Sequence, residues 1–195
     1  KYMRSNVSNG GNWMCFALDW SRVRSCCTRM SYVDCHIQLI VLKHRNSLNI
    51  NEIKALGEVA HLVAPNLLHH LFFGAAAEAF PNARTYAAPG LAKKRPDLKF
   101  DEKLSSETQF PGISSHFIDG APLMRETMFV HEGETLICAD IFQNNFNPKN
   151  WLSKMTCVMA GTSEQVGVSR LVQLAVKDRS AFKTDLHKVL NASFE

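Results

Sequence analysis

The chain has 195 residues, of which 46% are hydrophobic and 21% are charged. These values are near the averages for globular proteins and exclude a wholly disordered or fibrous chain, and the length fits one domain. The formal net charge of +4 comes from scattered Lys and Arg residues with one basic cluster at 92–99, beside acidic residues. This pattern disfavours a nucleic-acid partner, because nucleic-acid binders concentrate their charge on one face.

The longest apolar stretches fall short of the roughly 20 residues that a membrane-spanning helix needs, so we expect no membrane segment. No signal sequence precedes the cysteines and no Cys-x-x-Cys pair occurs, which favours reduced thiols in a cytoplasmic protein. A zinc knuckle near the N-terminus is the alternative, although its spacing matches no finger or ribbon pattern. Its candidate ligands are Cys15, Cys26, Cys27, Cys35 and His36. The pattern does not indicate an oligomeric state.

The first half of the chain alternates strand and helix patterns. Residues 1–28 show no sustained period and are interpreted as an N-terminal extension of uncertain structure, with one domain at 29–195. A capping-box pattern, Asn49 with Glu52, opens a short helix that Gly57 ends. The expected strands are 31–35, 36–42, 59–65 and a short strand within 82–90, and the expected helices are 50–57 and 67–80.

The second half changes to consecutive strands. Residues 91–114 are polar and contain prolines, which predicts a long surface loop. Strands are expected at 115–120, 126–131 and 135–142, the last two joined as a hairpin, and helices at 151–159, 163–176 and 180–190. This order indicates an α/β (α+β) fold, in which a mixed sheet carries helices on its faces.

Polar residues follow two buried strands at their carboxyl ends, where α/β folds place their sites. His69 and His70 follow the strand that ends at Pro65, and Asp140 follows an apolar run. An acid there should face solvent, a metal ion or a backbone N–H, because burying it without a partner is costly. The alternative for the histidines is a pair at a helix start, with one ring packed and one solvated, or with one ring donating to a strand carbonyl. The alternative for Asp140 is an N-cap or a hydrogen-bond acceptor in the turn that follows it.

The stretch "VAPNLLHHLFFGAAAEAFPNARTYAAPGLAKKRPDLKFD" resembles the signature of the DUF4336 family, a domain-of-unknown-function family with the metallo-β-lactamase-like fold. "GAPLMRETMFVHEGETLICADIFQN" is similar to the central hairpin of that family, and the resemblance extends from Arg29 to Glu195. It implies a metallo-β-lactamase-like αββα sandwich with mixed sheets and a site at the sheet edge. The sandwich is expected to be incomplete at the C-terminus, because the family continues past "NASFE" into a strand and a last His-Gly.

Enzymes of this fold bind one or two metal ions that lower the pKa of a bound water, so that hydroxide is available as a nucleophile. The family's ligand motif maps onto this chain only in part: Pro65 and Leu67 occupy two of its histidine positions. The resemblance implies a reduced set of ligands for one divalent metal ion (zinc, iron or manganese), namely His70, Asp140, His69 and Glu126. The residues expected to bind substrate are Asn66, Lys94 and Arg95. The alternative for Asn66, which the pattern favours, is that it satisfies backbone groups in the turn before the helix.

The resemblance therefore implies a metal-dependent hydrolase of a small-molecule ester, thioester or phosphoester. The alternative is a degenerate, non-catalytic scaffold or ligand-binding member of the same fold, since several ligand positions are apolar or missing. Glu126 has the further alternative of a surface charge or a partner of Arg125, and His131 is expected to be exposed. The basic segment near residue 94 is interpreted as an anion-binding loop or lid, or as a solvated loop.

Overall fold

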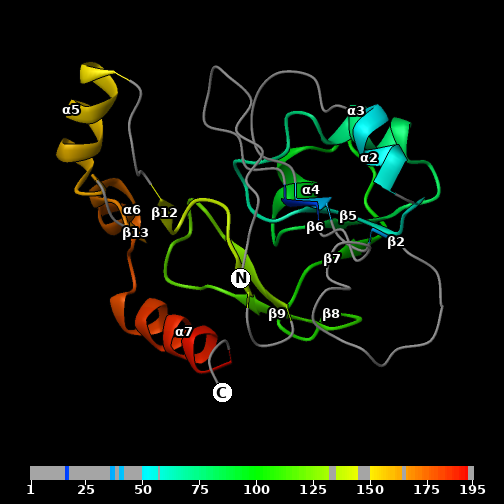
Figure 1. Cartoon of the computed structure of the whole chain (residues 1–195). Coiled ribbons are helices and arrows are strands. Elements are labelled where there is room, and N and C mark those ends of the chain that lie inside the picture. The colour runs from blue at the N-terminus through cyan, green and yellow to red at the C-terminus, as the bar shows by residue number, and fades with distance from the viewer. Residues whose placement is uncertain are drawn as a thin grey trace, which may run out of the picture. The chain divides into compact units, whose positions relative to one another are not determined.

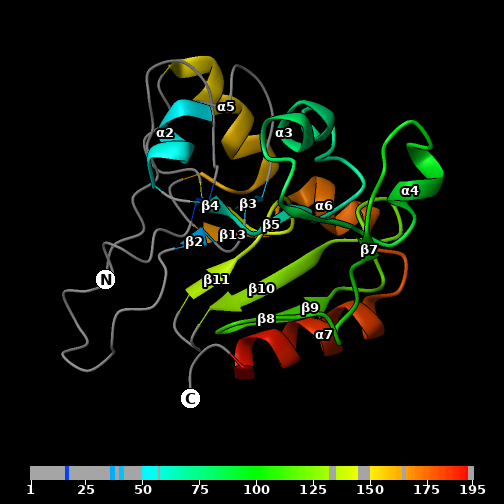
Figure 2. The ribbon, with the colours of Figure 1, turned by 90° about the vertical axis from the view of Figure 1, so that its right-hand side faces the viewer.

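The computed structural model describes residues 16–17, 36–37, 40–41, 50–56, 58–131, 135–144, 150–163 and 166–192 (Figures 1 and 2). The chain divides into two compact units, residues 1–104 and 105–195, and each unit is described by itself. The predicted boundary between residues 28 and 29 lies outside the described residues, as do the four N-terminal cysteines. That domain division stays a prediction.

A five-stranded, mostly parallel sheet forms the frame of the first unit (Figure 1). Its strands, in spatial order, are β1 (Phe16–Ala17), β3 (Ile40–Val41), β5 (His61–Ala64), β6 (Arg84–Ala87) and β7 (Glu102–Lys103). β1 is antiparallel to β3, and the other neighbours run parallel. β2 (His36–Ile37) and β4 (Glu58–Val59) form a separate parallel pair. The strand predictions at 36–42, 59–65 and 82–90 are confirmed as shorter elements, whereas 31–35 lies outside the described residues.

Within the described part of residues 1–104, three helices accompany this sheet: α2 (Ile50–Leu56), α3 (Phe73–Ala79) and α4 (Leu91–Lys94). α2 confirms the helix expected at 50–57, while its predicted caps, Asn49 and Gly57, lie outside the described residues. α3 begins at Phe73 rather than near Leu67, because Asn66 Oδ1 accepts the backbone N–H groups that follow it and holds the chain in turns. The core of the unit is apolar and is built from Leu62, Ala64, Phe73, Ala76 and Leu91, among others.

The prediction of one long surface loop at 91–114 is wrong. α4, β7 and β8 (Gln109–Phe110) all lie within this segment, and Leu104 is fully buried. Asp101 Oδ2 accepts hydrogen bonds from both the backbone N and the Oγ1 of Thr85, each at 2.7 Å. These long-range bonds, which a local pattern does not contain, place β7 against β6.

The second unit contains a four-stranded antiparallel sheet. Its spatial order is β11 (Thr135–Ile137), β10 (Thr127–His131), β9 (Ile113–Phe117) and β8. The expected hairpin of β10 and β11 is confirmed, with Phe129 opposite Ile137, and its turn at 132–134 lies outside the described residues. β8 and β9 are joined through Gly112, whose φ of 69° a residue with a side chain rarely adopts.

The C-terminal helices are α5 (Trp151–Ala160), α6 (Arg170–Ala175) and α7 (Arg179–Ala192). α5 and α7 confirm two predicted helices, but the helix expected at 163–176 is limited to α6, because β13 (Val166–Gly167) pairs with β12 (Gln143–Asn144). α7 lies along one face of β9 and β10 (Figure 2). There Met128 and Val130 of β10 belong to the same core as Val189 of α7.

The mixed α/β class is confirmed, since the chain combines a mostly parallel sheet, an antiparallel sheet and packed helices. Among the described helices, none is both long and apolar enough to cross a membrane. Neither Cys138 nor Cys157 forms a disulfide.

Candidate functional site

The first cluster of predicted site residues lies at the carboxyl ends of β5 and β6. These strands are parallel neighbours, with Ala64 opposite Ala87, so the segments that follow them leave the same edge of the sheet. Pro65 to His70 follows β5, and α4 with Arg95 follows β6 through Gly90, whose φ is 91°. The histidines lie in turns before α3 and not at a helix start.

Asn66 organises the segment after β5. Its side chain is fully buried, and its Oδ1 accepts hydrogen bonds from Leu68 N at 2.9 Å and His69 N at 2.8 Å. Because two backbone N–H groups donate to this atom, it must be the amide oxygen. Asn66, predicted to bind substrate, therefore has a structural role in shaping the turn.

The same oxygen fixes the tautomer of His69. His69 Nδ1 lies 3.0 Å from Asn66 Oδ1, which can only accept, so Nδ1 carries the proton. In the neutral ring the lone pair is then on Nε2, the arrangement that a metal-ligating imidazole needs. His69 is buried, with 8% of its surface exposed.

His70 has the opposite tautomer. Its Nδ1 lies 2.8 Å from Nη1 of Arg95, and a guanidinium can only donate, so Nδ1 is the acceptor and the proton of the neutral ring is on Nε2. Burial, followed by the charges of Lys94 and Arg95, lowers the pKa of His70, which favours the neutral ring. In this state neither nitrogen has a lone pair available for a metal ion.

Arg95 and Lys94 bring positive charge to this edge. The Nε and Nη2 atoms of Arg95 donate to the two carboxylate oxygens of Asp97 at 2.8 and 2.6 Å, while Nη1 contacts His70. Three of the five guanidinium N–H groups are thus engaged. Lys94 Nζ donates to the carbonyl oxygen of Leu67 at 2.6 Å, which links α4 to the segment after β5.

Glu126, in the second unit, is neither a surface charge nor a partner of Arg125. Its side chain is fully buried, and its carboxylate accepts three backbone N–H groups, from Ala139 at 2.6 Å, Asp140 at 2.8 Å and Ile141 at 3.1 Å. Burial raises the pKa of Glu126, and these three bonds act against that rise. The carboxylate therefore holds the loop after β11 in place and does not fit the role of a metal ligand.

Asp140 lies in that loop and is half-buried. Its backbone is positioned by Glu126, which gives its carboxylate a defined place just after the strand. His131, expected to be exposed, is buried at the end of β10 with 7% of its surface exposed. Because the histidines belong to residues 1–104 and Asp140 to residues 105–195, the convergence of an imidazole with this carboxylate stays a prediction.

Within the described ranges, no three His, Cys, Asp or Glu side chains gather closely enough to hold a metal ion. Of the four predicted ligands, His70 and Glu126 are engaged in ways that do not fit metal binding, whereas His69 and Asp140 keep suitable chemistry. The sequence interpretation missed Asp97, which orients Arg95 from two residues away, and a pair formed by Ser114 and His116 on β9. The short Arg-Pro-Asp spacing was the available signal for Asp97.

A scan against protein-family models and a search of curated proteins find no match to this chain. The resemblance to the DUF4336 family therefore depends on the strings quoted above.

Proposed function

We propose that this chain is a metallo-β-lactamase-like protein of the DUF4336 type in which a ligand-binding site has replaced the metal centre of the enzymes. The mixed α/β class and the quoted strings support the family part of the proposal. The observation that carries the functional part is the 2.8 Å contact between Arg95 Nη1 and His70 Nδ1. Because of this contact, the neutral ring of His70, one of the predicted metal ligands, can only donate from Nε2.

The ligand is proposed to be a small anion, a carboxylate or phosphate compound. Lys94 and Arg95 supply positive charge at the carboxyl edge of the parallel sheet, and His70 adds an Nε2–H donor beside them. Toward the residues that the structure describes, only part of the donor capacity of the two cations is used. An anion that accepts these N–H groups forms charge-assisted hydrogen bonds, which are stronger than neutral ones.

Imidazole ¹⁵N NMR of the full chain tests the donor assignment. We expect His69 to be protonated on Nδ1 and His70 on Nε2, and zinc addition to leave the His70 nitrogens unshifted. Metal analysis after zinc-, iron- or manganese-supplemented expression should find far less than one ion per chain. Near-stoichiometric metal that is lost in both His70→Ala and Asp140→Ala, but kept in the exposed control His187→Ala, would overturn the proposal.

The anion is tested by titrating inorganic phosphate and following backbone amide shifts. Arg95→Gln should weaken binding about 10- to 100-fold, the range that corresponds to one charge-assisted hydrogen bond. Lys93→Gln is the matched control, since Lys93 lies on α4 two residues before Arg95, carries the same charge and is exposed. If both variants lose the same amount of phosphate affinity, phosphate binding depends only on net charge, and the proposed site is rejected.

The tautomer of His69 supports a second candidate, the metal-dependent hydrolase. A neutral His69 ring with the proton on Nδ1 has the tautomer of a metal-ligating imidazole, which is compatible with one divalent ion. A metal content that depends on His69 and Asp140, and not on His70, would favour this candidate.

A further inference from the structure

Two leucines are exposed at the carboxyl edge of the parallel sheet in the first unit. Leu68 is 49% and Leu71 is 58% exposed, whereas the two histidines between them are buried. Both leucines belong to the turns that join β5 to α3, and Asn66 Oδ1 fixes these turns by accepting the N–H of Leu68 at 2.9 Å. A segment of defined conformation therefore presents two large apolar side chains to solvent.

Positive charge lies directly beside these leucines. Lys94 Nζ donates to the carbonyl oxygen of Leu67 at 2.6 Å, immediately before the first exposed leucine. Arg95 Nη1 lies 2.8 Å from His70 Nδ1, immediately before the second exposed leucine. These two contacts join α4 and the residue after it to the turns, so the apolar and cationic groups form one surface.

Two further lysines extend the charge along the same edge of the sheet. Lys93 is exposed on α4, and the exposed Lys103 ends β7, whose parallel neighbour β6 ends at this edge as well. Asp97 is already paired with Arg95 at 2.6 Å. Among the described residues, none of Lys93, Lys94 and Lys103 forms an ion pair with an acid. Their charge is therefore available to an anionic partner.

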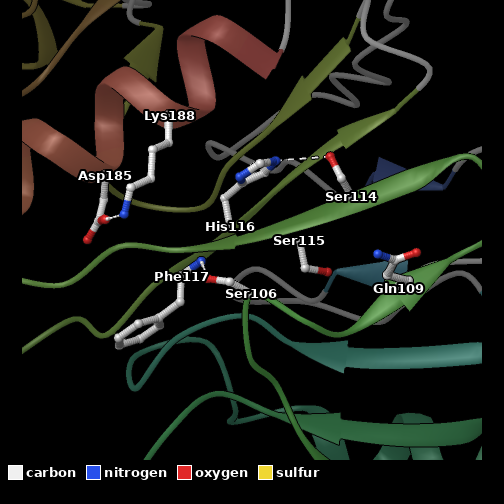
Figure 3. A pocket seen from close by; sticks show the side chains of 8 residues that line it. All are labelled: Ser106, Gln109, Ser114, Ser115, His116, Phe117, Asp185 and Lys188. Carbon is white, nitrogen blue, oxygen red and sulfur yellow. Dashed lines mark hydrogen bonds and ion pairs between the residues drawn. The ribbon is translucent and has the colours of Figure 1, made fainter.

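The hollow between β9 and α7 in the second unit differs from this edge (Figure 3). There Lys188 Nζ lies 2.9 Å from Asp185 Oδ1, so the two charges neutralise each other. The other oxygen of Asp185 accepts the backbone N–H of Asp119 at 3.0 Å. Of these two surfaces, the leucine-bearing edge is the one that keeps charge for an anionic partner.

A bilayer with anionic phospholipids matches this combination of groups. Lysine and arginine side chains near a membrane are attracted by its negative surface potential, and their N–H groups form charge-assisted hydrogen bonds with phosphate oxygens. Exposed leucines gain free energy when their apolar area leaves water, and the acyl region of a bilayer provides such an environment. The two kinds of group thus complement the two layers of a lipid surface.

We propose that this edge docks the protein on a bilayer that contains anionic phospholipid. Leu68 and Leu71 insert at the boundary of the acyl chains, and Lys93, Lys94 and Arg95 contact the headgroup phosphates. The inference rests on the anion site of the proposed function and names its anion as a lipid headgroup. Docking of this kind places the protein on the membrane surface and requires no helix that crosses the bilayer.

Co-sedimentation of the full chain with vesicles tests the docking. We expect binding to vesicles of equal parts phosphatidylserine and phosphatidylcholine, and much weaker binding to vesicles of phosphatidylcholine alone. The double variant Leu68→Ser/Leu71→Ser should bind the mixed vesicles about 10- to 30-fold more weakly, because roughly half of each leucine side chain is left to be buried. Leu123→Ser is the matched control, since Leu123 also lies in a turn and is 64% exposed, and it should bind as the wild type does.

Lys93→Gln distinguishes a lipid headgroup from free phosphate. The loss of one cation near an anionic surface should weaken binding to the mixed vesicles about fivefold. The affinity of this variant for inorganic phosphate should stay unchanged, because Lys93 is not one of the donors proposed for the small anion. The leucine double variant should likewise keep the phosphate affinity and the urea midpoint of the wild type, which shows that it is folded.

The docking is overturned if both kinds of vesicle bind equally, or if the leucine double variant binds the mixed vesicles as tightly as Leu123→Ser does. It is also overturned if poly-L-glutamate binds with the same dependence on the leucines and the vesicles do not, which would assign the edge to an acidic protein partner. Phosphate binding that depends on Arg95, without vesicle binding, refutes the docking and leaves the proposed function standing. Leucine-dependent vesicle binding without phosphate binding supports the docking and refutes the small free anion.

Discussion

Asn66→Ala tests the most direct link between one side chain and the candidate site. Asn66 Oδ1 accepts three hydrogen bonds, from two backbone N–H groups and from the His69 ring. Removing it leaves the buried His69 N–H and Nδ1–H without this acceptor, while Leu68, 49% exposed, can recruit water for its N–H.

The expected cost follows from these three bonds. A net hydrogen bond between neutral groups contributes about 0.5–1.5 kcal/mol, and a buried donor left unpaired costs more. We therefore expect the free energy of unfolding to fall by about 2–4 kcal/mol, with most of the loss from the two buried donors. Asn66→Asp keeps the accepting oxygen in the same place and should retain the geometry of the turn.

Two measurements check this expectation. Urea unfolding followed by circular dichroism gives the global loss, and amide hydrogen exchange at His69 should accelerate about 30-fold or more, which corresponds to the lower end of that range. Imidazole ¹⁵N shifts should show that His69 loses its preference for the Nδ1–H tautomer. The control Asn82→Ala, at an exposed position, should change stability by less than about 0.5 kcal/mol. An unchanged tautomer together with an unchanged urea midpoint in Asn66→Ala would refute the reasoning.

Two further predictions concern His70 and Glu126. The pKa of His70 in the folded protein is lowered from 6.5, so as the pH falls the unfolded chain binds a proton at His70 before the folded chain does. The stabilising contribution of His70 is therefore complete above pH 6.5 and is lost as the pH falls toward the folded pKa. The difference in urea stability between wild type and His70→Asn should change between these two pKa values only, and a constant difference would contradict the assignment. Glu126→Gln replaces one accepting oxygen by an NH₂ group, so the hydrogen of at least one backbone amide at 139–141 should exchange with solvent about tenfold faster. Glu107→Gln, at an exposed position, is the control and should leave the exchange of these amides unchanged.

The local patterns of the chain were sufficient for most elements. The apolar run at 59–65, the hairpin strands around 126–137 and the helix at 180–190 all form close to where periodicity and turn residues place them, because neighbours in sequence decide these features. Errors occurred where distant bonds decide the structure. Asp101 reaches Thr85 across 16 residues and thereby adds β7 to a sheet, within a segment whose prolines favour a loop.

For the candidate site, the sequence by itself determined which polar residues follow buried strands: His69 and His70 after β5, and Asp140 after β11. Only the tertiary structure decided what these residues can do. Arg95 meets His70 across 25 residues and sets its tautomer, and Glu126 reaches the amides of the loop around Asp140 from 13 to 15 residues away. The protonation of an imidazole and the availability of a carboxylate depend on which donor lies within about 3 Å, and the folded chain brings these donors from distant positions.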